Sequence, residues 1–142
     1  MKDINVLTLN SITGNVTFDF RDGNEIVSGR DALIQRATLY LLNDAGSSAF
    51  DPNVGSSISD IIGGSYAEGE HDVVKTLITL GVEEIEQKML GEQSGVNFAE
   101  DELDTKLKSI EIIEINFNET SVAWNVKILV RTAANNIGII GL

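Results

Sequence analysis

Residues 28–62 read SGRDALIQRATLYLLNDAGSSAFDPNVGSSISDII, a helical apolar pattern followed by a long polar loop and a second, shorter apolar run. Ser28 is placed to cap the first helix, and Asp31 in its first turn favours the positive end of the helix dipole. The apolar residues that recur at helical spacing predict one buried face: Leu33, Ile34, Ala37, Tyr40 and Leu41. This order of helix, loop and short helix decides how the remaining segments are read.

A long loop joins these two helices. The first helix is predicted to end near Asn43–Asp44, with Gly46 as a stop, and the second covers Ile58–Ile62 and ends at Gly63–Gly64. Between them lies Pro52, the only proline of the chain, which stiffens the backbone. A long, rigid loop between two packed helices is either a costly connection or a contact surface.

The longest predicted helix covers residues 69–90. Its buried face is predicted from the apolar spacing: Val73, Leu77 or Ile78, Ile85 and Met89. Gly81 lies inside this helix, where glycine costs about 1 kcal/mol relative to alanine, so we expect a close approach of another element there. Residues 91–97 predict a loop, and residues 103–107 predict a short helical turn or linker.

In the N-terminal region, apolar and polar residues alternate with the period of a β-strand. Val16, Phe18 and Phe20 alternate with polar residues, and Asp22–Gly23 supplies a turn before Glu25–Val27, which predicts a β-hairpin. Residues 4–9 are expected to add extended chain, with a loop over residues 11–15.

The C-terminal third predicts a second hairpin. Its first strand, Lys108–Phe117, alternates but slips by one position at Ile112–Ile113, which indicates a β-bulge. Its second strand, Val122–Arg131, alternates cleanly and is apolar on one face. Residues 118–121 are expected to form the loop between the strands, and residues 132–142 a flexible tail with exposed isoleucines.

Together these patterns predict an α+β fold, with an N-terminal β-hairpin and about three helices packed on an antiparallel sheet that ends in a C-terminal β-hairpin. The 142 residues suit one domain with a single core. Within it we expect a β region over residues 1–27, a helical region over 28–107, the hairpin over 108–131 and the tail over 132–142.

Composition and charge narrow the function classes. A net charge of −12, with only ten scattered Lys and Arg residues, argues against nucleic acid as a partner. No apolar run approaches the ~20 residues that cross a bilayer, so no membrane partner is expected. The polar start Met1–Asn5 is unlike a signal peptide, which suits a cytoplasmic site of synthesis. Residues 121–142 contain no acid and carry Lys127 and Arg131, so an apolar, weakly basic strand region is attached to an acidic body.

The sequence shows no catalytic constellation. There is no cysteine, and the one histidine, His71, lies between Glu70 and Asp72, where neighbours on a helix point in different directions. The acidic segment Glu100–Asp104 fits a solvated loop and helix start better than a two-carboxylate site. Trp124 falls on an apolar strand face and fits the core. We therefore expect no enzymatic activity, no cofactor and no metal site.

Three blocks of the sequence resemble a known family. Residues 27–36 resemble the start of its first helix, a glycine followed by an amphipathic run that contains Gln. Residues 41–46 followed by 51–56 resemble its leucine-rich helix end, glycine and proline-containing loop, and the third block is the acidic segment before Leu103 with the two strands after it. The family is that of the small baseplate wedge proteins of contractile tails, often described as sheath initiators. Tailed phages and type VI secretion machines share it, and it carries a lysozyme label in some phages.

The resemblance implies a structural role. The protein would be a component of a contractile phage tail baseplate in the virion, where it would join the wedge to the first sheath ring and template sheath assembly by strand exchange. Its partners would be the larger baseplate wedge proteins, the tail sheath protein and tail tube or hub proteins, in a six-fold assembly. Many family members carry Glu directly after the glycine that corresponds to Gly46, whereas this chain has Ser47–Ser48.

The expected partner-binding residues fall in two segments. In the loop they are Phe50, Asp51, Pro52, Asn53 and Gly55, and in the second C-terminal strand they are Val122, Trp124, Val126, Lys127, Ile128 and Arg131. A strand edge next to apolar chain can accept or donate strands through main-chain hydrogen bonds. Such an edge is a liability unless a partner covers it.

Two other function classes stay open. One is a small protein-binding or assembly-chaperone module that uses the same strand edge on a different partner. The other is a baseplate-associated hydrolase, which would need two carboxylates in a cleft. Whether the chain occurs only with wedge and sheath proteins separates the first two classes, and a cleft lined by two close carboxylates would favour the third.

Overall fold

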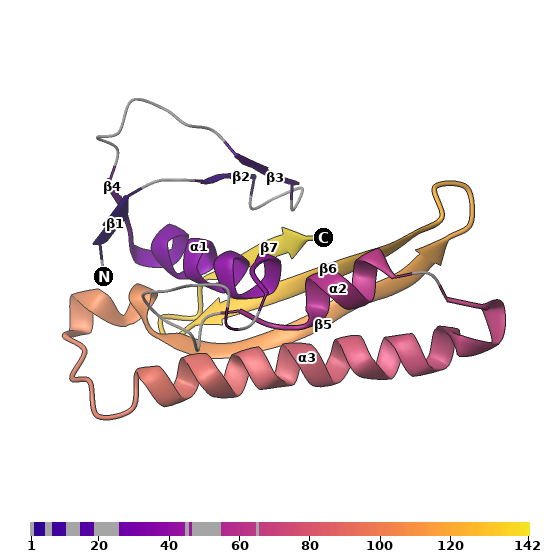
Figure 1. Ribbon diagram of the computed structural model, residues 1–142. Helices are drawn as coiled ribbons and strands as arrows, with labels where there is room; N and C mark the ends of the chain where they lie inside the picture. The colour runs from indigo at the N-terminus through magenta and orange to yellow at the C-terminus, as the bar shows by residue number, and fades with distance from the viewer. Residues whose placement is uncertain are drawn as a thin grey trace.

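The computed structural model describes residues 2–4, 7–10, 15–18, 26–44, 46, 55–64 and 66–142. Helices pack on an antiparallel sheet of three strands in the order β5-β6-β7, which confirms the predicted α+β class (Figure 1). The sheet strands are β5 (Leu107–Asn118), β6 (Ala123–Thr132) and β7 (Ile137–Gly141). The helices are α1 (Gly29–Leu42), α2 (Ile58–Gly63) and α3 (His71–Glu92), with short 3-10 helices η1 (Glu68–Glu70) and η2 (Glu100–Thr105).

The described residues before α1 form four short strands, and their pairing differs from the predicted one. β1 (Lys2–Ile4) pairs with β4 (Ile26–Ser28), and β2 (Leu7–Asn10) pairs with β3 (Asn15–Phe18), both antiparallel. A hairpin between the strands near residues 16–20 and 25–27 is therefore wrong, and its Asp22–Gly23 turn lies outside the described residues. Only residues 11–14 separate β2 from β3, so the nearer strand in the sequence takes the pairing.

Helix α1 buries the face that its spacing predicts. Leu33, Ile34 and Tyr40 are among its fully buried side chains. Ser28 occupies the N-cap position in an extended conformation, but its side chain makes no capping hydrogen bond, contrary to the prediction. Gly29, the first helical residue, has a left-handed φ of +63°, which departs from the geometry in which an N-cap oxygen reaches the following N–H groups.

Helix α3 covers the predicted segment, but part of its predicted buried face is wrong. Val74 and Ile78 are fully buried, whereas Val73 is 59% exposed and Leu77 is 40% exposed. The helix carries two neighbouring apolar rows, and only one of them faces the core. The expected close approach at Gly81 is confirmed, because a Cβ there would lie 2.7 Å from Cγ1 of Ile58 on α2.

The C-terminal segment is a strand, and the expected flexible tail is wrong. β7 pairs with β6 antiparallel, and its Ile140 is fully buried. Helix α1 contacts both β7 and β6. Gly138, which lies between two isoleucines, allows β7 to pass close to α1. The predicted bulge is confirmed by a register shift between Ile112 and Glu114, and the predicted hairpin pairs over almost the whole length of both strands.

The core lies between one face of the sheet and the helices. α1 packs on β7 and β6, α2 on β6, and α3 along β5 (Figure 1). Side chains from all three sheet strands meet the helices there: Leu107, Ile110, Trp124, Val126, Ile128, Val130 and Ile140. This packing fixes the hairpin in position relative to α3.

A candidate strand-addition site on the sheet

The β5–β6 hairpin extends beyond the end of β7. β6 pairs with β5 as far as Ala123, but it pairs with β7 only from Lys127 to Arg131. One further pair of main-chain hydrogen bonds joins Val126 to Leu142, at 2.8 and 3.4 Å. Figure 1 shows the outer part of the hairpin projecting past the C-terminal strand. Within the described residues, this part of β6 has a strand partner on the β5 side alone.

The main chain of Trp124 faces the uncovered side of β6. In an antiparallel ladder, alternate residues direct both their N–H and C=O groups to the same neighbouring strand. Val126 directs both groups to Leu142, so Trp124, two residues earlier, directs its groups to the same side. No residue in the described ranges occupies the position opposite Trp124 on that side. We call this position the β6 notch.

Aromatic rings hold the base of the projecting hairpin on α3. Phe117 pairs with Trp124 across the hairpin, and the His71 ring lies 4.6 Å from the Phe117 ring and 5.2 Å from the Trp124 ring, between centroids. Trp124 is only 3% exposed, and its Nε1 has no hydrogen-bond partner among the described residues. The rings therefore fix the notch relative to the helical layer without taking up its main-chain groups.

Side chains from α3 and from its C-cap residue Gln93 close the inner part of the other sheet edge. The amide of Gln93 donates to the Leu107 carbonyl at 2.7 Å and accepts from the Leu107 N–H at 2.9 Å. A carboxylate oxygen of Glu86 accepts from the Ile110 N–H at 2.6 Å. These contacts replace the bonds of a neighbouring strand, so the inner half of β5 is protected from strand addition.

Of the partner-binding residues expected in the loop between α1 and α2, the structure describes only Gly55. Phe50, Asp51, Pro52 and Asn53 lie outside the described residues. Gly55 is buried with a φ of +117°, and a Cβ there would lie 2.5 Å from the Asp44 carbonyl oxygen. Close packing against the backbone of Asp44 therefore explains why this position is a glycine.

On the second strand, three of the expected partner-binding residues could offer a partner only their main chain. Trp124, Val126 and Ile128 point into the core and are at most 3% exposed, so their side chains are not available to a partner. Lys127 lies on the opposite face and forms an ion pair with Glu114 at 3.2 Å, and Arg131 on the same face is half-buried.

Val122 precedes β6 instead of starting it, which corrects the predicted strand boundary. It lies in the hairpin turn with a φ of 50° and is 76% exposed. The turn is stabilised by Asn118, whose side-chain oxygen accepts from the N–H groups of Thr120 and Ser121. Val122 is therefore the most exposed large apolar residue near the notch.

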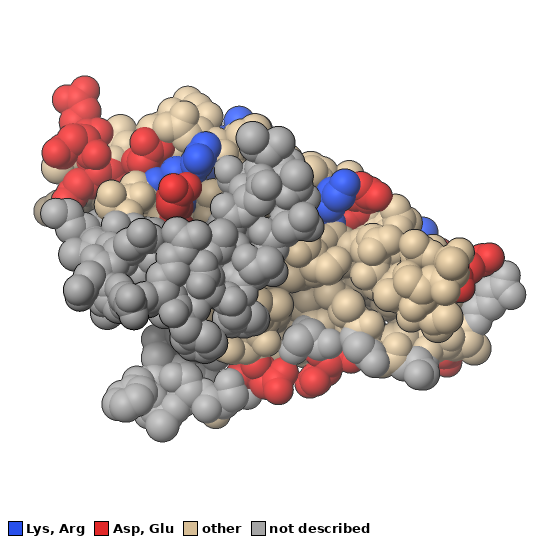
Figure 2. All heavy atoms as spheres, turned by 90° about the horizontal axis from the view of Figure 1, so that it is seen from above, with Lys and Arg blue, Asp and Glu red and all other residues tan. Residues whose placement is uncertain are grey.

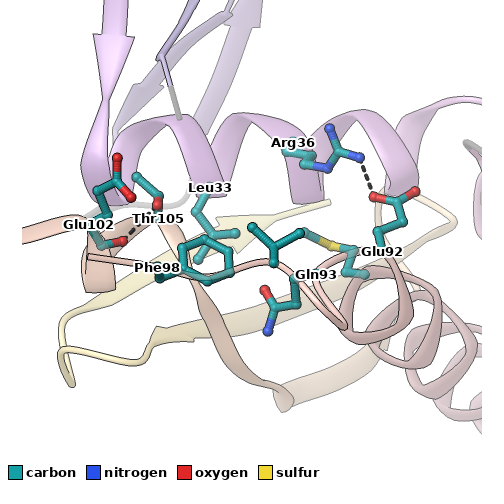
Figure 3. Close-up of a pocket in the computed structure, with 9 residues that line it drawn as sticks. Leu33, Arg36, Glu92, Gln93, Phe98, Glu102 and Thr105 are labelled. Carbon is teal, nitrogen blue, oxygen red and sulfur yellow. Dashed lines mark hydrogen bonds and ion pairs between the residues drawn. The ribbon is translucent and has the colours of Figure 1, made fainter. Parts of the chain in front are cut away.

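A pocket of about 320 Å³ opens between α1, the C-terminal end of α3 and η2 (Figure 3). Leu33, Met89, Val96 and Phe98 supply its apolar walls. At one end the Glu92 carboxylate accepts hydrogen bonds from the Arg36 guanidinium and the Tyr40 hydroxyl. Burial alone lowers the pKa of Arg36, but the hydrogen bond and charge of Glu92, with a contribution from Tyr40, outweigh it and raise the pKa.

The remaining polar groups of this pocket also have partners. The Gln93 amide bonds to Leu107, and the Thr105 hydroxyl donates to the Glu102 carbonyl at 2.7 Å. Because these groups are engaged within the chain, the pocket offers an incoming group mainly apolar contact. Such a lining suits an apolar group better than a polar substrate.

Acidic side chains gather at the end of the molecule where η2 lies, at the left of Figure 2. Glu100, Asp101 and Glu102 are exposed there, and the Asp104 carboxylate accepts from Thr132 and Asn136 at 3.0 and 2.6 Å. In the described ranges, no group of three or more His, Asp or Glu side chains could hold a metal ion. No helix of the described chain is long and apolar enough to cross a membrane.

Two features of the sheet therefore define the candidate site. Within the described residues, the C-terminal hairpin has an open main-chain position at Trp124, and side chains of α3 and of its C-cap residue Gln93 close the inner edge of β5. Both features are properties of the sheet edge, not of a cleft with converging side chains. Comparison with models of protein families, with curated proteins and with solved structures finds no match for this chain.

Proposed function

We propose that this chain is a structural component of a contractile phage tail baseplate. In this role it joins the wedge to the first sheath ring and templates sheath assembly by accepting a strand. The resemblance of residues 27–56 and of the acidic segment with its following strands supports the family. The open β6 notch supports the mode of binding.

The observation that carries the proposal is the main chain of Trp124, which has no strand partner among the described residues on the side of β7. A strand that continues the line of β7 would run antiparallel to β6 and form its first hydrogen bonds with Trp124. Main-chain bonds need no particular side-chain sequence in the incoming strand. The site therefore suits a protein that starts a ring of identical subunits.

The loop around Phe50, Asp51, Pro52 and Asn53 is proposed to contact the larger wedge proteins. The sheet and the loop would then serve different partners, because β6 receives the sheath strand. A chaperone-like binding module using the same notch is the alternative, and it is distinguished by its absence from the finished tail.

A self-donated strand tests the proposal. Six residues that alternate Thr and Val are added after Leu142, so that the chain fills its own notch, and a control carries six Gly and Ser residues instead. Both proteins should fold and enter wedges, since the extension follows Leu142 and replaces no residue of the core or of the loop. Electron microscopy should show baseplates without polymerised sheath for the alternating extension and normal sheath for the control.

Normal sheath on the alternating extension would contradict the proposal, provided that hydrogen exchange shows the Trp124 amide protected in that variant. If the protein is found during assembly but not in finished particles, the chaperone alternative is favoured instead.

A further inference from the structure

Helix α3 carries a second apolar row that no described element covers. Val73, Leu77 and Leu80 are 59%, 40% and 54% exposed. Their spacing of i, i+4 and i+7 places them on one line along the helix. The buried row that contacts the core, which includes Val74 and Ile78, lies beside it. We call the three exposed residues the α3 stripe.

Carboxylates continue the α3 stripe toward the C-terminal end of the helix. Glu83 and Glu84 follow Leu80 at i+3 and i+4, so both lie next to it on the surface, and both are exposed. Lys88, one turn after Glu84, pairs with Glu84 at 2.9 Å and donates to the Gly55 carbonyl at 3.4 Å. The stripe is therefore an apolar row that ends in negative charge.

The charges argue against a second copy of this chain as the occupant. In an antiparallel pairing of two α3 helices centred on Leu77, Glu84 of one copy would lie opposite Glu70 of the other. In a parallel pairing, Glu83 and Glu84 of both copies would lie side by side. Both arrangements bring like charges together in a partly desolvated contact, which is unfavourable.

We propose that the α3 stripe binds a basic amphipathic helix of a partner protein. The partner helix presents apolar residues at i, i+4 and i+7, and a Lys or Arg one turn further along meets Glu83 and Glu84. This is the helix-in-groove mode of recognition, with charge complementarity that sets register. The inference goes beyond the proposed function, because strand addition uses the main chain of β6 and none of these side chains.

Two designed helical peptides of about 18 residues serve as probes. Both carry Leu at i, i+4, i+7 and i+11, and they differ only in flanking residues, which are Lys in one and Glu in the other. Amide spectra of the full chain are recorded during titration at low salt. The Lys-flanked peptide is expected to bind at least about tenfold more tightly, with shifts confined to residues 71–84.

Matched variants locate the contact. Leu77→Ser with Leu80→Ser should weaken the Lys-flanked peptide at least about tenfold, because apolar contact area is lost. Val96→Ser with Val122→Ser removes two other exposed apolar side chains, which are 53% and 76% exposed, and should leave binding unchanged. Glu83→Gln keeps the apolar stripe intact and should reduce the preference for the Lys-flanked peptide.

Three results would overturn the inference. The first is equal affinity for the two peptides, and the second is undiminished binding to the Leu77→Ser, Leu80→Ser variant. The third is a dimer of the chain in sedimentation that this variant abolishes, since a second copy would then be the occupant. None of these measurements depends on sheath assembly, so failure here is separate from failure of the proposed function.

Discussion

Gly138 shows at single-residue scale how closely β7 lies against α1. A Cβ at this position would lie 2.8 Å from Cγ1 of Ile34 and closer still to its Cδ1. Ile34 is fully buried, so it has little room to move. We expect Gly138→Ala to lower the free energy of unfolding by about 1–3 kcal/mol.

Urea unfolding followed by circular dichroism measures this change. Gly91→Ala is the matched control, because a Cβ at Gly91 meets nothing within 4 Å and alanine favours the helix. A Gly138→Ala protein as stable as the wild type would show that β7 can move away from α1 at no cost.

Residue spacing predicted which side chains share a face, but not always which face is buried. Leu33, Ile34 and Tyr40 were predicted correctly because α1 has one apolar row. On α3, Val73 and Val74 are chemically equivalent and belong to different rows, so the sequence could not tell which row meets the sheet. The choice is made by tertiary packing, in which α2 approaches Gly81.

At the scale of elements, the contact between α3 and the edge of β5 is the least predictable from sequence. Gln93 was placed in a loop, and nothing in its neighbourhood signals that its amide bonds to both main-chain groups of Leu107. β7 was missed for another reason. Glycines and a short run of isoleucines resemble an apolar tail until a strand partner is known, and β6 supplies that partner.

We expect Gln93→Ala to open the inner edge of β5. The variant leaves the half-buried main-chain groups of Leu107 without partners in the chain, which should cost about 1–3 kcal/mol. It also exposes an edge that can pair with another molecule. Thermal unfolding measures the first effect, and size-exclusion chromatography over a range of concentrations measures the second.

Gln87→Ala is the control for this variant, because Gln87 is exposed on the same helix. A Gln93→Ala protein that stays monomeric and equally stable would show that the Gln93 contacts do not protect the edge.

For the whole molecule, we expect that removing residues 137–142 abolishes cooperative unfolding. A flexible tail could be deleted without effect, but β7 carries the buried Ile140 and pairs with the central strand. Its loss exposes the neighbouring core of α1 and β6 to water. Near-ultraviolet circular dichroism and the unfolding transition measure the result. A truncated chain with a wild-type transition would contradict the assignment of β7 to the core sheet.

Part of the candidate site could be read from the sequence, and part could not. The apolar, acid-free C-terminal region indicated a strand edge that binds a partner through main-chain groups, and this stays a prediction. The structure places the Trp124, Val126 and Ile128 side chains in the core, and within the described residues no strand lies opposite the Trp124 main chain on the β7 side. Alternation reports side-chain faces, whereas an open edge depends on how far neighbouring strands extend.

The bulge in β5 changes which alternate residues of the strand face the core on either side of it. Before it, Ile110 and Ile112 lie opposite core residues of β6, and after it Ile115 and Phe117 do so, so the parity of the core-facing positions changes. If Ile113 instead kept the regular alternation, Glu114 and Asn116 would turn inward and Phe117 would turn away from Trp124. The bulge therefore accommodates one extra residue while it keeps the outer half of β5 in register with β6.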